Sequence, residues 1–447
     1  MRRYESYKDS GVDWLGEIPS HWECLPIRSI FKFRNEKNDP IKTDNILSLS
    51  IANGVTEYSD ENRGGNKRKD DLSSYKLAYP NDIVLNSMNV IVGAVGVSKY
   101  FGAISPVYYA LSLYNQRANL SYYENIFKNE NFQRGLLRFG KGILIKFGEN
   151  GKMNTIRMKI SQDDLKKLYF PIPPLSEQQK IAQFLDDKTA KIDQAVDLAE
   201  KQIVLLKEHK QILIQNAVTR GLNPDVPLKD SGVDWLGEIP SHWECLPIRS
   251  IFKFRNEKND PIKTDNILSL SIANGVTEYS DENRGGNKRK DDLSSYKLAY
   301  PNDIVLNSMN VIVGAVGVSK YFGAISPVYY ALSLYNQRAN LSYYENIFKN
   351  ENFQRGLLRF GKGILIKFGE NGKMNTIRMK ISQDDLKKLY FPIPPLSEQQ
   401  KIAQFLDDKT AKIDQAIALK TAHIEKLKEY KSVLINDVVT GKVRVSV

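Results

Sequence analysis

A perfect internal repeat constrains this chain more than any other feature. Residues 8–195 recur without a change as residues 229–416, at an offset of 221 (229 − 8) and over 188 positions (195 − 8 + 1). Solenoid repeats cover about 20 to 50 residues, so a unit of this length is a whole domain. Surface positions drift where substitutions cost little. Perfect identity therefore indicates a recent duplication, and we expect two copies of one fold.

Composition narrows the class of protein. The 447 residues are 41% hydrophobic and 26% charged, which is typical of a globular protein of two or more domains. The net charge of +12 favours a polyanionic partner, although charge alone puts nucleic acid only slightly ahead of an ordinary basic protein. The sequence has no apolar run of membrane-spanning length and no secretory signal. We expect a cytoplasmic protein without a membrane partner, in which Cys24 and Cys245 are reduced, buried thiols.

The first part of each repeat reads as a mixed α/β domain. Apolar and β-branched runs predict strands over residues 82–85, 90–97 and 107–113, and helices over 122–137 and 161–168. The Pro-rich segment 171–174 can continue neither a helix nor a strand ladder, so it marks the end of the domain.

A long helix is predicted to follow. Ser176 is the predicted N-cap with Gln179 in a capping box, and Gly221 followed by Pro224 supplies the stop. Steps of four and three residues give an apolar seam that consists of Leu185, Thr189, Ile192, Val196, Ala199, Ile203, Leu206, Lys210, Leu213 and Ala217. The second repeat keeps this seam as Leu406, Thr410, Ile413, Ile417, Lys420, Ile424, Leu427, Lys431, Leu434 and Val438. At 1.5 Å per residue each helix is about 60 Å long.

The register of the two seams survives although the sequences diverge after Ala195, which indicates a fixed partner for each helix. The other helix is the predicted partner, in an antiparallel pair; the alternative is that each helix folds back on its own domain. The predicted fold class is mixed α/β, with two globular domains separated by a long antiparallel two-helix coiled coil and related by a pseudo-twofold axis. The predicted boundaries are 1–174 for the first domain, 175–221 for its helix, 222–395 for the second domain, and 396–447 for the second helix and tail.

Two motifs carry a resemblance to a known family. The first is Asp9-Ser10-Gly11-Val12-Asp13-Trp14-Leu15-Gly16-Glu17-Ile18-Pro19, followed by His21-Trp22-Glu23. The second is Phe170-Pro171-Ile172-Pro173-Pro174-Leu175-Ser176-Glu177-Gln178-Gln179-Lys180-Ile181, and both recur within 230–244 and 391–402. The chain resembles, over essentially its whole length, the specificity subunits of Type I restriction-modification systems. It departs from them in that the two target-recognition domains, normally different, are identical.

The resemblance implies a subunit that binds bipartite double-stranded DNA and holds two methyltransferase subunits through its helices. Restriction subunits join through the complex, and S-adenosylmethionine, ATP and Mg²⁺ belong to those partners. The sequence agrees with a non-catalytic role, because it has neither an Asp/Asn-Pro-Pro-Tyr/Phe methyltransferase motif nor a phosphate-binding loop. Its histidines at 21, 209, 242 and 423 are too scattered for a metal cluster.

A protein that recognises the base sequence of duplex DNA needs polar side chains at base edges and cations at phosphates. Three polar, partly basic segments of the repeat are candidates, and each recurs in the second copy. In the first copy the predicted DNA-binding residues are Arg63, Asn66, Lys67, Arg68, Lys69, Asn86, Ser87, Asn89, Lys141, Lys146, Lys152, Asn154 and Arg157. In the second they are Arg284, Asn287, Lys288, Arg289, Lys290, Asn307, Ser308, Asn310, Lys362, Lys367, Lys373, Asn375 and Arg378. A solvated loop or an ordinary turn explains parts of each segment as well.

The leading hypothesis is a sequence-specific DNA-binding scaffold. Identical domains related by a twofold axis must read identical half-sites, so the predicted target is an inverted repeat with an unspecified spacer. The alternative is a protein–protein adaptor whose basic charge is incidental, and a third possibility, a fused restriction enzyme, conflicts with the missing motifs. Lys207, Lys210, Lys428 and Lys431 are interpreted as solvated flanks of the coiled coil.

Overall fold

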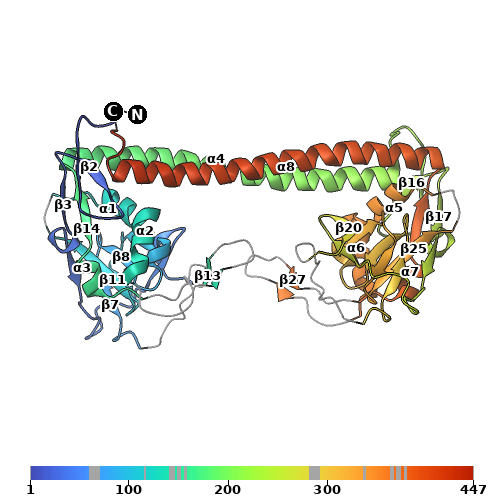
Figure 1. Ribbon diagram of the computed structural model, residues 1–447, viewed down its shortest axis with the longest axis horizontal. Coiled ribbons are helices and arrows are strands. Elements are labelled where there is room, and N and C mark those ends of the chain that lie inside the picture. The colour runs from blue at the N-terminus through green and yellow to red at the C-terminus, as the bar shows by residue number, and fades with distance from the viewer. Residues whose placement is uncertain are drawn as a thin grey trace. The chain divides into compact units, whose positions relative to one another are not determined.

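The computed structural model places the chain in two compact units (Figure 1). Unit 1 consists of Met1–Ala199 and Ala422–Val447, and unit 2 of Glu200–Thr421. The structure describes residues 2–59, 71–114, 117–139, 146–147, 153–155, 159–280, 292–335, 339–362, 367–368, 374–376 and 380–445. Among these residues, the structure contains no helix that is long and apolar enough to span a bilayer.

Unit 1 is built from short strands, short helices and parts of two long helices. Its strands are β1 (Tyr7–Asp9), β2 (Glu17–Pro19), β3 (Glu23–Pro26), β4 (Phe31–Arg34), β5 (Leu47–Ser50), β6 (Gly54–Glu57), β7 (Lys76–Ala78), β8 (Ile83–Asn86), β9 (Val95–Val97), β10 (Gly102–Ile104), β11 (Tyr108–Leu113), β12 (Lys146–Phe147), β13 (Met153–Thr155) and β14 (Tyr169–Ile172). Its short helices are η1 (Ile27–Ser29), η2 (Val90–Val92), α1 (Leu120–Phe127), α2 (Glu130–Leu136), η3 (Leu137–Phe139) and α3 (Gln162–Lys166).

A four-stranded antiparallel sheet of order β4-β11-β8-β9 forms the centre of unit 1. Both of its faces are buried, because alternate side chains of one strand join different apolar clusters. On β8, Ile83 and Leu85 face the main core, which α1 and α2 cover, whereas Val84 faces a smaller cluster formed with β5, β6 and β10. This arrangement explains why the strand reads as a continuous apolar run.

Three predictions differ from the structure. The Pro-rich segment 171–174 was expected to continue no strand ladder, but Pro171 and Ile172 belong to β14 and pair with β3. In this two-stranded sheet both strands are edge strands, where a residue without an N–H is tolerated. The strand predicted over 90–97 is a 3₁₀ turn followed by β9, because Gly93 adopts a left-handed φ of +80° that ends the turn. The helix predicted over 122–137 is two helices. Asn129 separates them as the N-cap of α2, and its side-chain oxygen accepts a hydrogen bond from the backbone N–H of Phe132 at 2.9 Å. The strands over 82–85 and 107–113 are confirmed as β8 and β11, within one residue at each end, and α3 confirms the helix over 161–168.

Unit 2 repeats this architecture. Its strands are β15 (Leu228–Asp230), β16 (Glu238–Pro240), β17 (Glu244–Pro247), β18 (Phe252–Arg255), β19 (Leu268–Ser271), β20 (Gly275–Glu278), β21 (Lys297–Ala299), β22 (Ile304–Asn307), β23 (Val316–Val318), β24 (Gly323–Ile325), β25 (Tyr329–Leu334), β26 (Lys367–Phe368), β27 (Met374–Thr376) and β28 (Tyr390–Ile393). Its short helices are η4 (Ile248–Ser250), η5 (Val311–Val313), α5 (Leu341–Phe348), α6 (Glu351–Leu357), η6 (Leu358–Phe360) and α7 (Gln383–Lys387). The central sheet has the order β18-β25-β22-β23.

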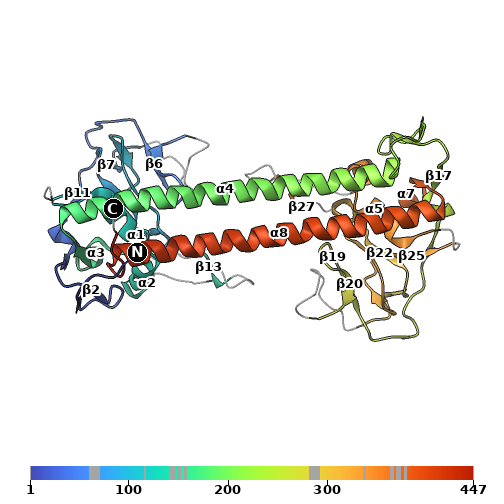
Figure 2. The same ribbon diagram turned by 90° about the horizontal axis from the view of Figure 1, so that it is seen from above.

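The two long helices are α4 (Leu175–Arg220) and α8 (Leu396–Val439), and they lie side by side in both views (Figures 1 and 2). Helix α4 begins one residue before the predicted N-cap Ser176, because the carbonyl of Pro174 already accepts the first helical hydrogen bonds. Gly221, with a φ of +75°, follows its last residue and confirms the predicted stop.

The predicted antiparallel pairing is present in each unit. In unit 1 the ammonium group of Lys431 on α8 lies 2.7 Å from the carboxylate of Asp193 on α4. In unit 2 the equivalent pair is Lys210 on α4 and Asp414 on α8, at 2.6 Å. The apolar seam positions described are buried or half-buried. Of the four lysines that were interpreted as solvated, Lys210 and Lys431 therefore form ion pairs between the helices.

Each domain is fastened to the start of its own long helix by residues of both family-like motifs. The carboxylate of Glu177 on α4 accepts a hydrogen bond from the indole N–H of Trp22 at 3.1 Å and contacts His21 at 3.0 Å. The side chain of Gln178 is fully buried, donates to the carbonyl of Pro173 and accepts from the backbone N–H of Asn119. These contacts fix the direction in which α4 leaves the domain.

The end of the other long helix completes each core. In unit 1, the C-terminal end of α8 contributes Leu434 and Val438 to the main cluster, and the hydroxyl of Tyr122 donates to the carbonyl of Val439 at 3.0 Å. In unit 2, the end of α4 takes this place, and Tyr343 donates to the carbonyl of Val218 at the same distance. Each domain is thus completed by the helix that follows the other copy.

The two cysteines are free, as expected, but they are half-buried rather than fully enclosed. Burial raises the pKa of the thiols of Cys24 and Cys245. A raised pKa keeps both groups as weakly reactive thiols at neutral pH.

Candidate nucleic-acid interface

Many predicted DNA-binding residues lie outside the described residues. They are Arg63, Asn66, Lys67, Arg68, Lys69, Lys141, Lys152 and Arg157 in the first copy, and Arg284, Asn287, Lys288, Arg289, Lys290, Lys373 and Arg378 in the second. Lys146 and Asn154 fall in strands β12 and β13, and Lys367 and Asn375 in β26 and β27, where the backbone alone is described. Lys362 is exposed, and its backbone forms an isolated bridge with Lys380.

In the first copy, the turn after β8 contains the predicted residues that the structure describes fully, and the matching turn after β22 repeats it with Asn307, Ser308 and Asn310. Asn86 is 7% exposed, and its side-chain oxygen accepts a hydrogen bond from the backbone N–H of Met88 at 3.0 Å. Ser87 is fully buried, and its hydroxyl donates to the carbonyl of Val107 at 2.7 Å. These two side chains shape the turn and present no free surface to a ligand, so we leave them out of the proposed contact set.

Asn89 is the exposed member of the same turn. Its backbone carbonyl accepts hydrogen bonds from the N–H groups of Val92 and Ala94, both at 3.1 Å. Its own N–H donates to the carbonyl of Asn86 at 3.0 Å, so the backbone is held on both sides of an exposed amide side chain. Such an amide can donate and accept at the same time, which is what recognition of a base edge requires.

A lysine that the sequence did not single out lies beside this turn. Lys76 on β7 donates from its ammonium group to the carbonyl of Tyr108 at 3.0 Å, and Tyr108 is paired with Asn86 in the sheet. The same ammonium group is 5.0 Å from the ring centre of Tyr109. Burial lowers the pKa of Lys76, and the positive charge of Lys159 lowers it further.

Lys159 is exposed and is joined to the turn through its neighbour Ile160. The backbone N–H of Ile160 donates to the carbonyl of Ser87 at 3.0 Å, and its carbonyl accepts from the hydroxyl of Tyr109 at 3.1 Å. Two cations that are 83 residues apart in the sequence (159 − 76) are thus linked to the turn that carries the exposed amide of Asn89. We define Lys76, Asn89 and Lys159 as the turn cluster.

Unit 2 builds the same cluster from Lys297, Asn310 and Lys380. The ammonium group of Lys297 donates to the carbonyl of Tyr329 at 3.0 Å, and burial followed by the charge of Lys380 lowers its pKa. The backbone N–H of Ile381 donates to the carbonyl of Ser308 at 3.0 Å. The geometry can hold one anionic group beside one polar edge in each unit. Among the described residues no group of His, Cys, Asp and Glu could hold a metal ion.

A family model decides the identity of the chain. The model of the Type I restriction modification DNA specificity domain matches residues 19–202 and 240–429, which together cover most of the sequence. The chain belongs to this family. It is a DNA-specificity subunit of a type I restriction-modification system, and it is the non-catalytic member of that system. The cofactors of such a system belong to its methyltransferase and restriction subunits.

Relatives of similar length support the assignment. The chain is 24% identical to the putative type I restriction enzyme MjaX specificity subunit of Methanocaldococcus jannaschii, with 96% of each chain covered. It is 21% identical to the type I restriction enzyme EcoDI specificity subunit of Escherichia coli, over 89% of this chain and 83% of that protein.

Solved structures show the same fold. A chain in the structure described as "Structural basis underlying complex assembly and conformational transition of the type I R-M system" aligns with a TM-score of 0.65 at 12% identity, and 95% of this chain and 99% of that chain are covered. The HsdS subunit from Thermoanaerobacter tengcongensis aligns with a TM-score of 0.52 at 12% identity, with 95% and 98% covered. The predicted mixed α/β class, with two repeated recognition halves and paired long helices, is thereby confirmed.

Proposed function

We propose that this subunit reads a DNA target made of two identical, inverted half-sites separated by an unspecified spacer. The observation that carries the proposal is the identity of the two recognition domains. Every contact of the turn cluster recurs in the second copy, so the two domains present the same donors, acceptors and charges. The antiparallel pairing of α4 and α8 within each unit supports the inverted order of the half-sites.

The proposed DNA contacts are the turn cluster and the basic loops predicted from the sequence. Lysines of the cluster are suited to phosphates, and the exposed amides of Asn89 and Asn310 to base edges. The loop residues Arg63, Lys67 and Arg68 extend the positive surface. This assignment predicts that binding releases counterions and weakens steeply as salt is raised.

The proposed protein partners are two methyltransferase subunits, held by the long helices in the cytoplasm, with restriction subunits joining through the complex. Support comes from large apolar side chains that the helices leave exposed outside the seam. Leu205 and Ile212 on α4 are 62% and 56% exposed, and Leu419 on α8 is 65% exposed. Leu205 and Ile212 are seven residues apart and therefore lie on one face of α4, and a row of exposed apolar side chains on one face is typical of a surface that another protein covers.

Binding to duplex DNA as a function of salt tests the proposed activity. The complex of this subunit with its methyltransferase is titrated with duplex DNA over a range of salt concentrations. We expect the logarithm of affinity to fall linearly with the logarithm of salt concentration. An affinity that does not respond to salt contradicts DNA binding and supports the adaptor alternative.

Shortening of the helices tests whether they set the spacer. Removal of four residues from the seam of both helices shortens each by about 6 Å, which corresponds to nearly two base pairs at about 3.4 Å per pair. We expect the methylated half-sites to move closer by that amount. A control that replaces the same four residues by alanine keeps the length and should keep the spacer, and an unchanged spacer after the deletion contradicts the proposal.

A further inference from the structure

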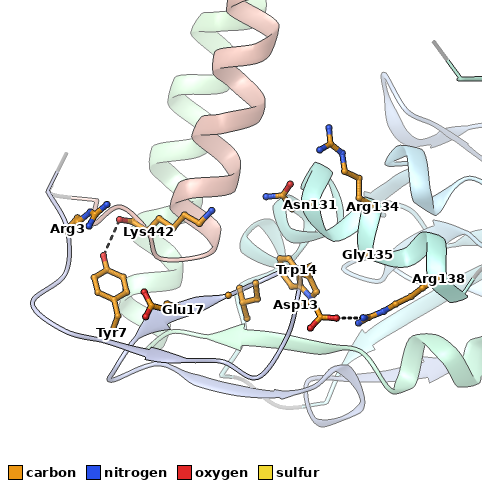
Figure 3. A pocket seen from close by; sticks show the side chains of 12 residues that line it. Arg3, Tyr7, Asp13, Trp14, Glu17, Asn131, Arg134, Gly135, Arg138 and Lys442 are labelled. Carbon is orange, nitrogen blue, oxygen red and sulfur yellow. Dashed lines mark hydrogen bonds and ion pairs between the residues drawn. The ribbon is translucent and has the colours of Figure 1, made fainter. Parts of the chain in front are cut away.

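Unit 1 contains a pocket that the proposed function does not use. It has a volume of about 720 Å³. Its lining comes from the N-terminal segment, the C-terminal segment, β2 and α2 (Figure 3). A cavity of this size accommodates a small molecule. Four cations line it, namely Arg3, Arg134, Arg138 and Lys442, together with the carboxylates of Asp13 and Glu17.

The cations come from opposite sides of the pocket. Arg3 and Lys442 belong to the terminal segments, whereas Arg134 lies on α2 and Arg138 on η3 (Figure 3). The terminal side is held by a hydrogen bond from the hydroxyl of Tyr7 to the carbonyl of Lys442 at 3.1 Å. The backbone N–H of Arg444 also donates to the carbonyl of Arg2 at 2.8 Å, so the two ends of the chain form one wall.

The opposite wall is fixed to the long helix. Asn131 of α2 donates from its side chain to the side-chain oxygen of Asn436 on α8 at 2.8 Å. Gly135 lets α2 approach Trp14, because a Cβ at this position would lie 3.2 Å from that of the tryptophan. The indole ring of Trp14 is also packed edge-on against Phe132, with ring centres 5.2 Å apart. Both walls are therefore built before any ligand arrives.

The charges of the pocket are incompletely balanced. Arg138 is paired with Asp13 at 2.6 Å, and Arg134 lies 3.9 Å from Glu130, a weak pair on the helix surface. Among the residues that the structure describes, Arg3 and Lys442 have no ion-pair partner within 4.0 Å. Glu17 is the remaining carboxylate of the lining, so the four cations face two carboxylates and the pocket keeps a positive excess.

Unit 2 lacks the residues that line the terminal side of this pocket, although its domain has the same sequence. At the repeat offset of 221, Arg3 and Tyr7 correspond to Pro224 and Leu228. Lys442 follows the capping Gly441, and the residue that follows the matching Gly221 is Leu222. Unit 2 does have a cation in the corresponding region, Arg220. Its guanidinium lies 3.7 Å from the carboxylate of Glu238, the counterpart of Glu17. The positive excess is therefore particular to unit 1.

We propose that this pocket binds a phosphate-bearing ligand. Guanidinium groups match the geometry of phosphate oxygens, and a lysine adds a mobile point charge. Cations on two opposite walls suit a ligand with more than one anionic group rather than a single carboxylate. The phosphate can come from a free polyphosphate or from a nucleic-acid strand. The site is distinct from the turn cluster, and the proposal does not depend on the DNA target.

Calorimetric titration of the full chain with sodium tripolyphosphate at low ionic strength tests the proposal. We expect saturable binding at one site per chain. Replacement of both terminal cations, by Arg3→Gln with Lys442→Gln, should lower the affinity at least about tenfold, because two charge-assisted contacts are lost. Arg134→Gln should weaken binding in the same direction.

The repeat supplies a matched control. Arg355→Gln makes the same local change in unit 2 as Arg134→Gln makes in unit 1, and both arginines are more than 70% exposed, so neither change threatens the fold. Only the unit 1 variant should lose affinity. The proposal is overturned by an absence of saturable binding, by two equal sites per chain, or by equal losses in the two variants.

A second arm separates the two sources of phosphate. Phosphorus NMR follows bound tripolyphosphate while a short duplex is added. Displacement of tripolyphosphate, together with weaker duplex binding by the variant lacking Arg3 and Lys442, identifies a nucleic-acid strand as the ligand. Tripolyphosphate that stays bound in the presence of duplex identifies a free polyphosphate.

Discussion

The two recognition domains have the same sequence over 188 residues, and the comparison shows which contacts a domain makes by itself. The guanidinium of Arg34 binds the carboxylate of Asp82 at 2.8 and 3.1 Å, and Arg255 binds Asp303 at the same two distances. Contacts within the domain are thus reproduced, because their partners are encoded in the repeat.

The units differ where the end of the other long helix docks. In unit 1 the side-chain oxygen of Asn436 accepts hydrogen bonds from Asn129 and Asn131. In unit 2, Gln215 occupies this position, and the side-chain nitrogen of the buried Asn350 has no partner among the described residues. The contacts inside each domain are determined by the repeated sequence, whereas the contacts with the docked helix end tolerate variation.

The largest effect is expected inside the domain. Asp82→Ala leaves the guanidinium of Arg34 with only the weaker contact to Glu36 at 3.9 Å and also removes the acceptor for the backbone N–H of Tyr79, at 2.9 Å. We expect a loss of about 3 to 5 kcal/mol in the free energy of unfolding of unit 1. Denaturant unfolding should show an equal loss in unit 2 for Asp303→Ala, and a difference of more than about 1 kcal/mol between the two variants would contradict the equivalence of the domains.

A smaller and unequal effect is expected at the docked helix ends. Asn436→Leu deprives two amide groups of their acceptor and should destabilise unit 1 by about 1 to 3 kcal/mol. Gln215→Leu removes a side-chain oxygen that has no partner among the described residues and a long hydrogen bond of 3.5 Å from the side-chain nitrogen to the carbonyl of Trp235, so its cost should stay below about 1 kcal/mol. Thermal unfolding of the two variants measures the difference. Equal costs would show that the helix interfaces are equivalent after all.

Lys76 should affect binding more than folding. Lys76→Met removes one cation near the proposed phosphate contact and should reduce the salt slope of DNA binding by about 1. Lys297→Met should do the same, and the two effects should add.

The lowered pKa of Lys76 gives this prediction a pH dependence. As pH rises through the alkaline range, Lys76 loses its proton before an ordinary lysine does, so its contribution to DNA affinity is lost earlier. The unfolded chain binds more protons than the folded chain in this range, so stability rises with pH there. If the DNA affinity of the Lys76→Met variant keeps the full pH dependence of the unmodified protein, Lys76 is not part of the interface.

The smallest effect is expected for the ion pairs between the helices. Lys431 is 31% exposed and Asp193 is 60% exposed, so solvent screens their interaction. Lys431→Met and the matching Lys210→Met should each cost at most about 1 kcal/mol in the free energy of unfolding. A cost of several kcal/mol in either variant would show that these pairs determine the helix register.

Local patterns predicted the features that depend on spacing along the chain. The apolar seam from Leu185 to Ala217 could be predicted because every step of three or four residues returns to one face of a helix. The strand predicted through Gly93 was wrong, because a positive φ at one glycine breaks an apolar run that otherwise looks continuous. Lys76 was missed because its link to the turn runs through Tyr108, which is paired with Asn86, and a single lysine in a strand does not reveal this pairing.

Contacts with residues distant in the sequence were also beyond prediction. Each domain core is completed by the long helix of the other copy. A prediction of this contact would need the direction in which the helices pair and the hydrogen bonds that Tyr122 and Tyr343 donate to the helix ends. The pocket between the termini depends on Arg3 and Lys442, which lie 439 residues apart (442 − 3) and outside the repeat. Neither residue belongs to a motif, so no sequence signal marks the pocket.

The most direct test of the central claim is a map of methylated adenines in cells that carry this subunit with its methyltransferase. Two identical recognition domains predict one target whose halves are inverted copies of each other, with a spacer of fixed length and free sequence. A methylated target with two unlike halves would contradict the account.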